Sequence, residues 1–346
     1  MGALAADFVN YRNAFQLFAG QMQTSVKLTA SARLHLGFLD LNGGTGRRFG
    51  SLGLAIDRPV TSLTIARAPE TRVEGPERDR VAAHLASLTG RFGLRGGYCV
   101  TIHEAIPAHV GLGSGTQLAL AVAAALRRLE GATPDVNTDA LALQRGLRSG
   151  VGAALFSTGG FVVDGGHGAG KAMPPILCRV DFPEEWRVIL VLDKAVKGVH
   201  GAKEREAFAS LPRFPAPAAG DICRRVLMQA LPAVVERDLP QFGEAIGHIQ
   251  AILGNYLAPA QGGDRYTSPS VAAVMARLEQ EGAKGIGQSS WGPAGFAFAA
   301  SDDAAQRLVK LIQTDRLAGE NKAQANPIML ICKANNSGAK IEMIGT

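Results

Sequence analysis

The sequence predicts a mixed α+β protein with two domains. A chain of 346 residues is of the length that two domains usually occupy. Stretches with strand alternation and helical stretches are interspersed in both halves, and prolines punctuate residues 174–186 between them. With 47% hydrophobic residues, the chain can bury substantial cores. We therefore expect an N-terminal extension at 1–23 and domains at 24–185 and 186–346.

The first half opens with β structure and then alternates helices with strands. Alternating apolar residues predict strands, and a segment rich in Ala and Leu predicts a helix. The expected elements are strands within 24–66 around the turn Asn42-Gly43-Gly44, a helix ending at Gly90 or Gly93, a strand at 98–107, helices at 118–131 and 138–148, and a glycine-rich loop with a strand at 149–166.

The second half also mixes both kinds of element. We expect a buried strand at 186–193, a loop at 214–220, helices broken around Pro232 and Pro240, and a helix, glycine loop and strand within 268–301. The richest apolar stretch is far below the ~20 residues that span a bilayer. The N-terminal segment lacks the apolar core and cleavage site of a secretory signal. These observations favour a cytoplasmic protein that does not bind membranes.

Charge and cysteine content narrow the class of ligand. Lys and Arg number 36 against 30 Asp and Glu, a formal charge of +6 without a long basic run. That balance suits a small anionic ligand and argues against nucleic acid. The four cysteines lie far apart without a CxxC pair, so neither a zinc site nor a disulfide framework is indicated. We expect four buried thiols in a reducing compartment.

The strongest motif runs from Pro107 to Gln117 (PAHVGLGSGTQ), between a strand and a helix. Its three alternating glycines remove side chains, so backbone N–H groups can surround an anion. Hydroxyl groups and the helix N-terminus add further attraction for negative charge. We therefore predict a phosphate-binding loop rather than a plain glycine connection; its residues are Gly111, Leu112, Gly113, Ser114, Gly115, Thr116 and Gln117.

A second motif places Arg33 and His35 on one face of a strand, followed by Asp40 and a turn with Arg47 and Arg48. A polar face that leads into two arginines suits recognition of phosphate or carboxylate. A solvent-facing strand with a basic turn explains the same pattern equally well.

Three further segments carry weaker signals. Gln288, Ser289, Ser290 and Trp291 lie in a glycine-rich loop of the kind that walls a ligand pocket, or makes a structural turn. His200 and Glu204, at i and i+4, could ligate a metal if helical, although a solvated helix start explains them better. Gly165–Ala172 resembles a nucleotide-binding P-loop, but Ala172 lacks the needed hydroxyl and Pro174 forbids the helix.

Together these motifs resemble a known family. The loop of residues 107–117 resembles the PxxxGLGSS loop of the GHMP kinase superfamily, but Gly115 replaces the second serine. GLGSGTQ, SARLHLGFLDLNGG, SGVGAALFSTGGFVVDGGH and GIGQSSWGPAGFAF occur between residues 24 and 298. In this combination they resemble β-ribofuranosylaminobenzene 5′-phosphate synthases. The resemblance implies a GHMP-kinase-like two-domain α+β fold, with a ribosomal-S5-like N-terminal and a ferredoxin-like C-terminal domain, as a homodimer.

The resemblance also implies a reaction. 4-Aminobenzoate and 5-phosphoribosyl 1-diphosphate would give a C-riboside with release of CO2 and diphosphate, usually with Mg2+, at the start of tetrahydromethanopterin biosynthesis. Residues 111–117 would hold phosphate, and Arg33, Arg47 or Arg48 would grip phosphate or carboxylate. His35 falls within the catalytic motif. Asp40 would hold Mg2+ with Ser114 or stabilise positive charge on the ribose, and residues 288–291 would line the acceptor pocket.

Two other functions stay open from the sequence. One is a small-molecule GHMP kinase that uses the same loop for ATP, which the replacement by Gly115 argues against. The other is a relative that binds its ligand without catalysis. A hydroxybenzoate in place of 4-aminobenzoate is also compatible with the sequence.

Overall fold

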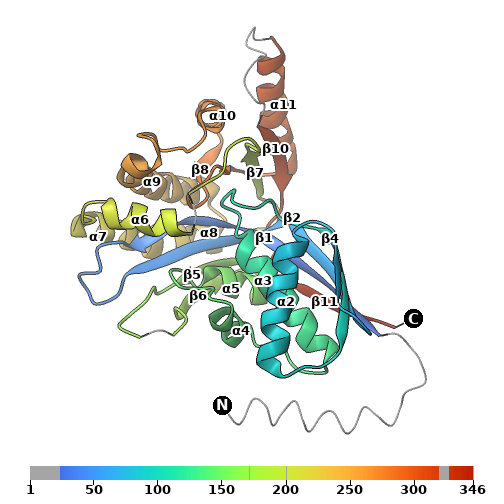
Figure 1. Ribbon diagram of the computed structural model, residues 1–346. Helices are drawn as coiled ribbons and strands as arrows, with labels where there is room; N and C mark the ends of the chain where they lie inside the picture. The colour runs from blue at the N-terminus through green and yellow to red at the C-terminus, as the bar shows by residue number, and fades with distance from the viewer. Residues whose placement is uncertain (1–23, 171, 200, 319–326, 346) are drawn as a thin grey trace.

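The computed structural model describes residues 24–170, 172–199, 201–318 and 327–345, so the expected extension at 1–23 lies outside the described residues. Two sheets organise this part of the chain. The first is built mainly from the N-terminal half and the second from the C-terminal half (Figure 1). The mixed architecture predicted from the sequence is confirmed, and the predicted division after residue 185 falls between β6 (Ile176–Val180) of the first sheet and β7 (Arg187–Leu192) of the second.

The N-terminal half supplies six strands of the first sheet and the helices beside it. Its elements are β1 Ser25–Asp40, β2 Phe49–Ala68, β3 Arg72–Glu74, α2 Arg78–Phe92, β4 Gly97–Glu104, α3 Ser114–Leu129, α4 Val136–Ala142, α5 Val151–Thr158, β5 Phe161–Asp164 and β6 Ile176–Val180. The sheet order is β11-β1-β2-β4-β3, and β5 pairs with β2 and β6. The expected strands within 24–66 are therefore one long hairpin of β1 and β2.

The C-terminal half forms the second sheet, of order β10-β7-β9-β8, and its helices. Its elements are β7 Arg187–Leu192, α6 Ala202–Ser210, α7 Ala216–Arg225, the π-helix η1 Val226–Ala230, α8 Leu231–Glu236, α9 Leu239–Leu257, the 3-10 helix η2 Ala258–Gln261, α10 Pro269–Gln280, β8 Lys284–Gln288, β9 Gly295–Ala299, α11 Asp302–Ala318, β10 Ile328–Cys332 and β11 Lys340–Ile344. Strand β11 crosses back and pairs with Ser25–Thr29 of β1. The last strand thus pairs within the first sheet, although its residues fall in the range predicted for the second domain.

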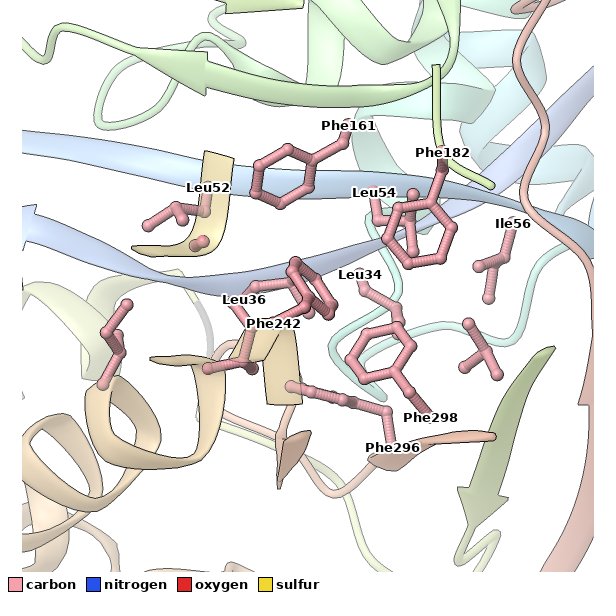
Figure 2. Close-up of a cluster of buried hydrophobic side chains, with 14 of the residues drawn as sticks. Leu34, Leu36, Leu52, Leu54, Ile56, Phe161, Phe182, Phe242, Phe296 and Phe298 are labelled. Carbon is pink, nitrogen blue, oxygen red and sulfur yellow. The ribbon is translucent and has the colours of Figure 1, made fainter. Parts of the chain in front are cut away.

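A phenylalanine cluster joins the two halves of the molecule (Figure 2). Phe161 of β5, Phe242 of α9 and Phe298 of β9 are fully buried against the leucines of β1 and β2. The ring centroids of Phe242 and Phe298 lie 5.1 Å apart in an edge-to-face arrangement. Because burying such rings removes a large apolar area from water, the two sheets are held at a fixed distance.

Several expectations fail. The loop expected at 214–220 is mostly the start of α7, and the glycine-rich segment expected at 149–166 contains the helix α5 before β5. The helix expected at 138–148 spans only Val136–Ala142, where the Asp135 side chain accepts a hydrogen bond from the Thr138 amide as N-cap. Residues 143–150 form a loop instead. Of the four cysteines expected to be buried, only Cys332 is buried; Cys178 is half-buried, and Cys99 and Cys223 are exposed. All four are free thiols.

No helix among the described residues is long and apolar enough to cross a bilayer.

A buried ion pair between α3 and α4 supplies a stability prediction. Arg127 and Asp139 are 3% and 1% exposed, and two 2.7 Å hydrogen bonds join the guanidinium to the carboxylate. Asp139→Asn leaves the guanidinium buried without its counter-ion, so we expect a loss of about 3–5 kcal/mol in the free energy of unfolding. Urea unfolding of the wild type and the variant measures this loss. Glu185→Gln breaks an exposed pair with Arg237 and should change the midpoint little; equal losses in both variants would contradict the assignment.

Candidate active site

The predicted phosphate loop lies between β4 and α3. Gly113 is the N-cap of α3 at a φ of 76°, in the left-handed region that glycine adopts without strain. The amides of Thr116 and Gln117 donate to the Gly113 carbonyl. Those of Ser114 and Gly115 belong to the first turn, where no intrahelical acceptor exists. The loop therefore presents N–H groups and the positive end of a helix of 16 residues.

The loop of residues 288–291 docks directly on the phosphate loop. The Ser289 hydroxyl donates to the Gly111 carbonyl at 2.7 Å and accepts from the His35 amide at 3.0 Å. A Cβ at Gly111 would lie 2.2 Å from the Ser289 carbonyl oxygen, so only glycine permits this approach. The two loops, predicted from motifs that are far apart in the chain, are thus brought together at β1.

Arg33 lies beneath the phosphate loop. Its backbone amide donates to the Leu112 carbonyl at 3.1 Å, and its Nη1 donates to the Gly111 carbonyl at 2.8 Å. Its buried Nε has no hydrogen-bond partner among the described residues. Burial lowers the pKa of the Arg33 guanidinium to about 10, which the negative charge of Glu204 partly offsets. The side chain is a buried cation with an unused donor.

His35, two residues along β1, is 4% exposed, and its Nε2 has no partner in the described structure. Burial lowers the pKa of the imidazole to about 3, and the cations Arg33 and Arg148 act in the same direction. The ring is therefore neutral at physiological pH and lies 4.5 Å, centroid to centroid, from Phe38.

The structure adds three residues that the sequence did not single out for this site. Arg148, from the loop after α4, pairs with Glu204 of α6 at 2.5 Å. Its guanidinium carbon lies 5.9 Å from the ring centre of Phe208, and that ring stands edge-on to Trp291 at 5.1 Å. Burial raises the pKa of the Glu204 carboxyl, against the pull of Arg148. The sequence does show Arg148 just before a glycine-rich segment. It cannot show that this arginine pairs with Glu204, which is distant in the chain.

Asp40, Arg47 and Arg48 lie at the far end of the β1–β2 hairpin. An Asp40 oxygen accepts from the amides of Asn42 and Gly43, at 2.6 and 3.0 Å, and so closes the turn. Arg47 donates to the carbonyls of Gly165 and Gly166, and Arg48 to that of Leu41. In this arrangement the three side chains stabilise the hairpin end.

Some predicted loop residues support the site from within the core. Gln117 is 1% exposed and donates to the Gly152 carbonyl, and Leu112 is equally buried. The side-chain oxygen of Gln288 accepts from the Thr267 amide, while its backbone amide donates to Gln250. Trp291 is 2% exposed. His200, the proposed partner of Glu204 in a metal site, lies outside the described residues.

The described residues contain no group of three or more His, Cys, Asp or Glu side chains that could hold a metal ion. Asp40, one of the two expected Mg2+ ligands, already accepts two backbone N–H bonds with one of its oxygens. Ser114, the other, lies in the first turn of α3. The two side chains suggested for Mg2+ thus offer one carboxylate and one hydroxyl.

Comparison with known proteins identifies the fold and the family. The GHMP kinases N terminal domain model matches residues 79–160, and the GHMP kinases C terminal model matches 230–313. β-Ribofuranosylphenol 5′-phosphate synthase of Methanocaldococcus jannaschii is 31% identical over 343 residues, covering 90% of this chain and 98% of its own. The chain belongs to this synthase family.

A second synthase and two solved structures are also similar to this chain. The Archaeoglobus fulgidus protein of the same name is 38% identical over 66% of this chain and 76% of its own. Among solved structures, homoserine kinase from Cytophaga hutchinsonii superposes with a TM-score of 0.67 at 18% identity, over 94% and 99% of the two chains. Mevalonate diphosphate decarboxylase from Staphylococcus aureus gives 0.62 at 15%, over 93% and 98%. The GHMP-kinase-like fold predicted from the motifs is confirmed, and the kinase alternative is not favoured.

The depressed pKa of His35 predicts a pH-dependent stability of the synthase. Below pH 6.5 the unfolded imidazole binds a proton that the folded one, with a pKa of about 3, does not bind. Stability therefore falls as pH decreases, by about 1.4 kcal/mol per unit, or about 2 kcal/mol by pH 5.

Urea unfolding of the wild type and His35→Gln at pH 7.5 and pH 5 measures this contribution. The variant should lose about 2 kcal/mol of the wild-type pH dependence. His103→Gln, which changes an exposed histidine of β4, should retain that dependence. Identical pH dependence in the wild type and His35→Gln would show that His35 titrates normally.

Proposed function

We propose that this synthase condenses 4-aminobenzoate, or its phenol analogue 4-hydroxybenzoate, with 5-phosphoribosyl 1-diphosphate. The products are the aryl C-riboside 5′-phosphate, CO2 and diphosphate. The observation that carries the proposal is the docking of residues 288–291 on the phosphate loop over Arg33, a buried cation with an unused N–H donor.

The geometry suits a reaction with anionic partners. Departure of diphosphate leaves positive charge at the ribose carbon, and the ring carbon that bears the carboxylate attacks it. Loss of CO2 then restores the aromatic ring. In this scheme the N–H groups of the first turn of α3 hold phosphate, and Arg33 binds an anionic group of either substrate. Fixed donors in a site shielded from water stabilise the separating charges without reorganisation.

The aromatic side chains beside this loop suit the acceptor. Phe38, Phe49 and Phe208 lie edge-on or tilted to one another, with centroids 5.8–5.9 Å apart, and Trp291 adjoins Phe208. Such a wall packs against a benzoate ring and excludes water. Arg148 lies at its edge, where a carboxylate would reach a guanidinium.

Mg2+ is part of the proposal as a companion of the diphosphate. The ion commonly uses phosphate oxygens and waters with one or two protein oxygens, so an incomplete protein site is compatible with it. Ser114, in the first turn of α3, would be the protein ligand. When bound, Mg2+ would neutralise charge on the leaving diphosphate. Residence in the cytoplasm, assembly as a homodimer and a place at the start of tetrahydromethanopterin synthesis are likewise proposed from the family resemblance.

The acceptor can be settled by competition. The archaeal relatives are named for a ribofuranosylphenol, whereas the motifs of this chain suggested an aminobenzene product. We expect 4-aminobenzoate, with its stronger electron donor, to be turned over faster than 4-hydroxybenzoate. Two equimolar mixtures of the acceptors are compared, one with the label on the carboxyl group of 4-aminobenzoate and one with it on that of 4-hydroxybenzoate. The rates of labelled CO2 release in the two mixtures give the ratio of the kcat/KM values. A ratio below one would assign the phenol acceptor instead.

Arg33→Ala removes the buried cation and tests the site. By analogy with loss of a donor in other active sites, we expect kcat/KM to fall at least 10²-fold in the labelled CO2 assay. The circular dichroism spectrum should be unchanged, because the Gly111 carbonyl retains its bond from Ser289. The matched control is Arg78→Ala, whose side chain is 70% exposed on α2. Full activity of Arg33→Ala would remove this residue from the site.

A further inference from the structure

A second group of basic side chains lies on the phosphate loop, apart from Arg33. Arg80 and His84, one turn apart on α2, and Arg145, from the loop after α4, form it. A Cβ placed on Gly115 would lie 3.1 Å from Arg80 Nη2 and 3.3 Å from Arg145 Nη1. Both guanidinium groups therefore lie over the first turn of α3. Figure 1 shows α2 and α3 running side by side.

The polar atoms of this group are incompletely used. The Nε of Arg145 and the Nε2 of His84 are buried and have no hydrogen-bond partner among the described residues. Arg80 pairs with Glu77 at 2.6 Å, whereas Arg145 has no ion pair in the described part of the chain. The proximity of Arg80 contributes, after burial, to lowering the pKa of the Arg145 guanidinium. Two like charges and a helix N-terminus thus face one another with a single carboxylate to balance them.

Such an arrangement costs free energy unless an anion joins it. Repulsion between neighbouring guanidinium groups and the loss of their hydration both oppose the charged state. A phosphoryl group would reverse both effects, because it accepts several N–H bonds and carries the opposite charge. Planar guanidinium groups suit phosphate oxygens especially well.

We propose that Arg80, His84 and Arg145 form a phosphoryl-binding site at Gly115, separate from the Arg33 side of the loop. This inference rests on the proposed function for the identity of its ligand, the 5′-phosphate or the 1-diphosphate of the ribosyl donor. The loop of residues 143–150 supports the separation. It sends Arg145 toward Gly115 and Arg148 toward Glu204, so a single segment supplies a cation to each side.

Calorimetric titration with two unreactive probes, inorganic diphosphate and ribose 5-phosphate, tests the proposal on the full chain. Arg145→Met keeps an unbranched apolar stem without the charge and should weaken the binding of one probe at least tenfold. Arg145→Lys should weaken it less. Arg78→Met, which changes an exposed arginine of the same helix as Arg80, should leave the binding of that probe within threefold of the wild type. Arg33→Met should weaken the binding of that probe less than Arg145→Met does. The probe that is weakened tells which phosphoryl group the site takes.

Wild-type affinity of Arg145→Met for both probes would overturn the proposal. Equal weakening of one probe by Arg33→Met and Arg145→Met would overturn the separation into two sites. If Arg145→Met does not fold, Arg80→Met gives the same information from α2. The labelled CO2 assay on the same wild-type preparation separates the two ideas. If the wild type releases CO2 and Arg145→Met binds both probes normally, only the phosphoryl-binding site is wrong. If Arg145→Met loses probe binding but the wild type releases no CO2, only the proposed function is wrong.

Discussion

The Ser289 hydroxyl makes the pair of hydrogen bonds on which the rest of the site depends. It donates to the phosphate loop at Gly111 and accepts from β1 at His35. The group is fully buried, so each bond replaces one that water would otherwise make. The outer edge of β1 is free for this contact because β11 pairs only with Ser25–Thr29. Beyond Thr29, two loops rather than a strand provide hydrogen-bond partners for the backbone of β1.

This edge explains why a buried arginine and a buried neutral histidine can lie side by side near the loop. Arg33 and His35 project from a strand that is fixed on one side by β2 and on the other by the two loops. Their positions are set by backbone hydrogen bonds and by the phenylalanine core beneath (Figure 2). A rigid support of this kind lets unfavourable electrostatics persist in the absence of substrate, which is a usual property of preorganised sites.

The local sequence predicted which side chains share a face of β1, but it did not predict that both faces are buried. Alternation along β1 correctly placed Leu34 and Leu36 in the core and Arg33 and His35 on the other face. That second face is also buried, because the loop of residues 288–291 packs on it. A local sequence pattern in β1 cannot predict a contact with a segment so distant in the chain. For the same reason the sequence could not show that Asp40, Arg47 and Arg48 make the hydrogen bonds that close the hairpin end. Gly111 was recognised as a loop glycine, but its close approach to Ser289 requires the folded chain.

The partners of Arg148 and Arg145 were inaccessible to sequence reasoning for a related reason. The expected helix at 138–148 stops at Ala142, and the loop that replaces it turns the two arginines toward different elements. Helical periodicity would have placed them on nearly the same face. The motifs identify the family and the backbone of the site, whereas the charges around it depend on where one helix ends.

The return of β11 to β1 has a consequence for synthesis on the ribosome. Strand β1 leaves the ribosome before its partner at Lys340–Ile344, which follows all the other described strands in the chain. Until then, the N-terminal end of β1 is an unpaired sheet edge, a surface that invites pairing with other chains. Nascent chains of this enzyme therefore carry an open edge until β11 has been made and can pair with it.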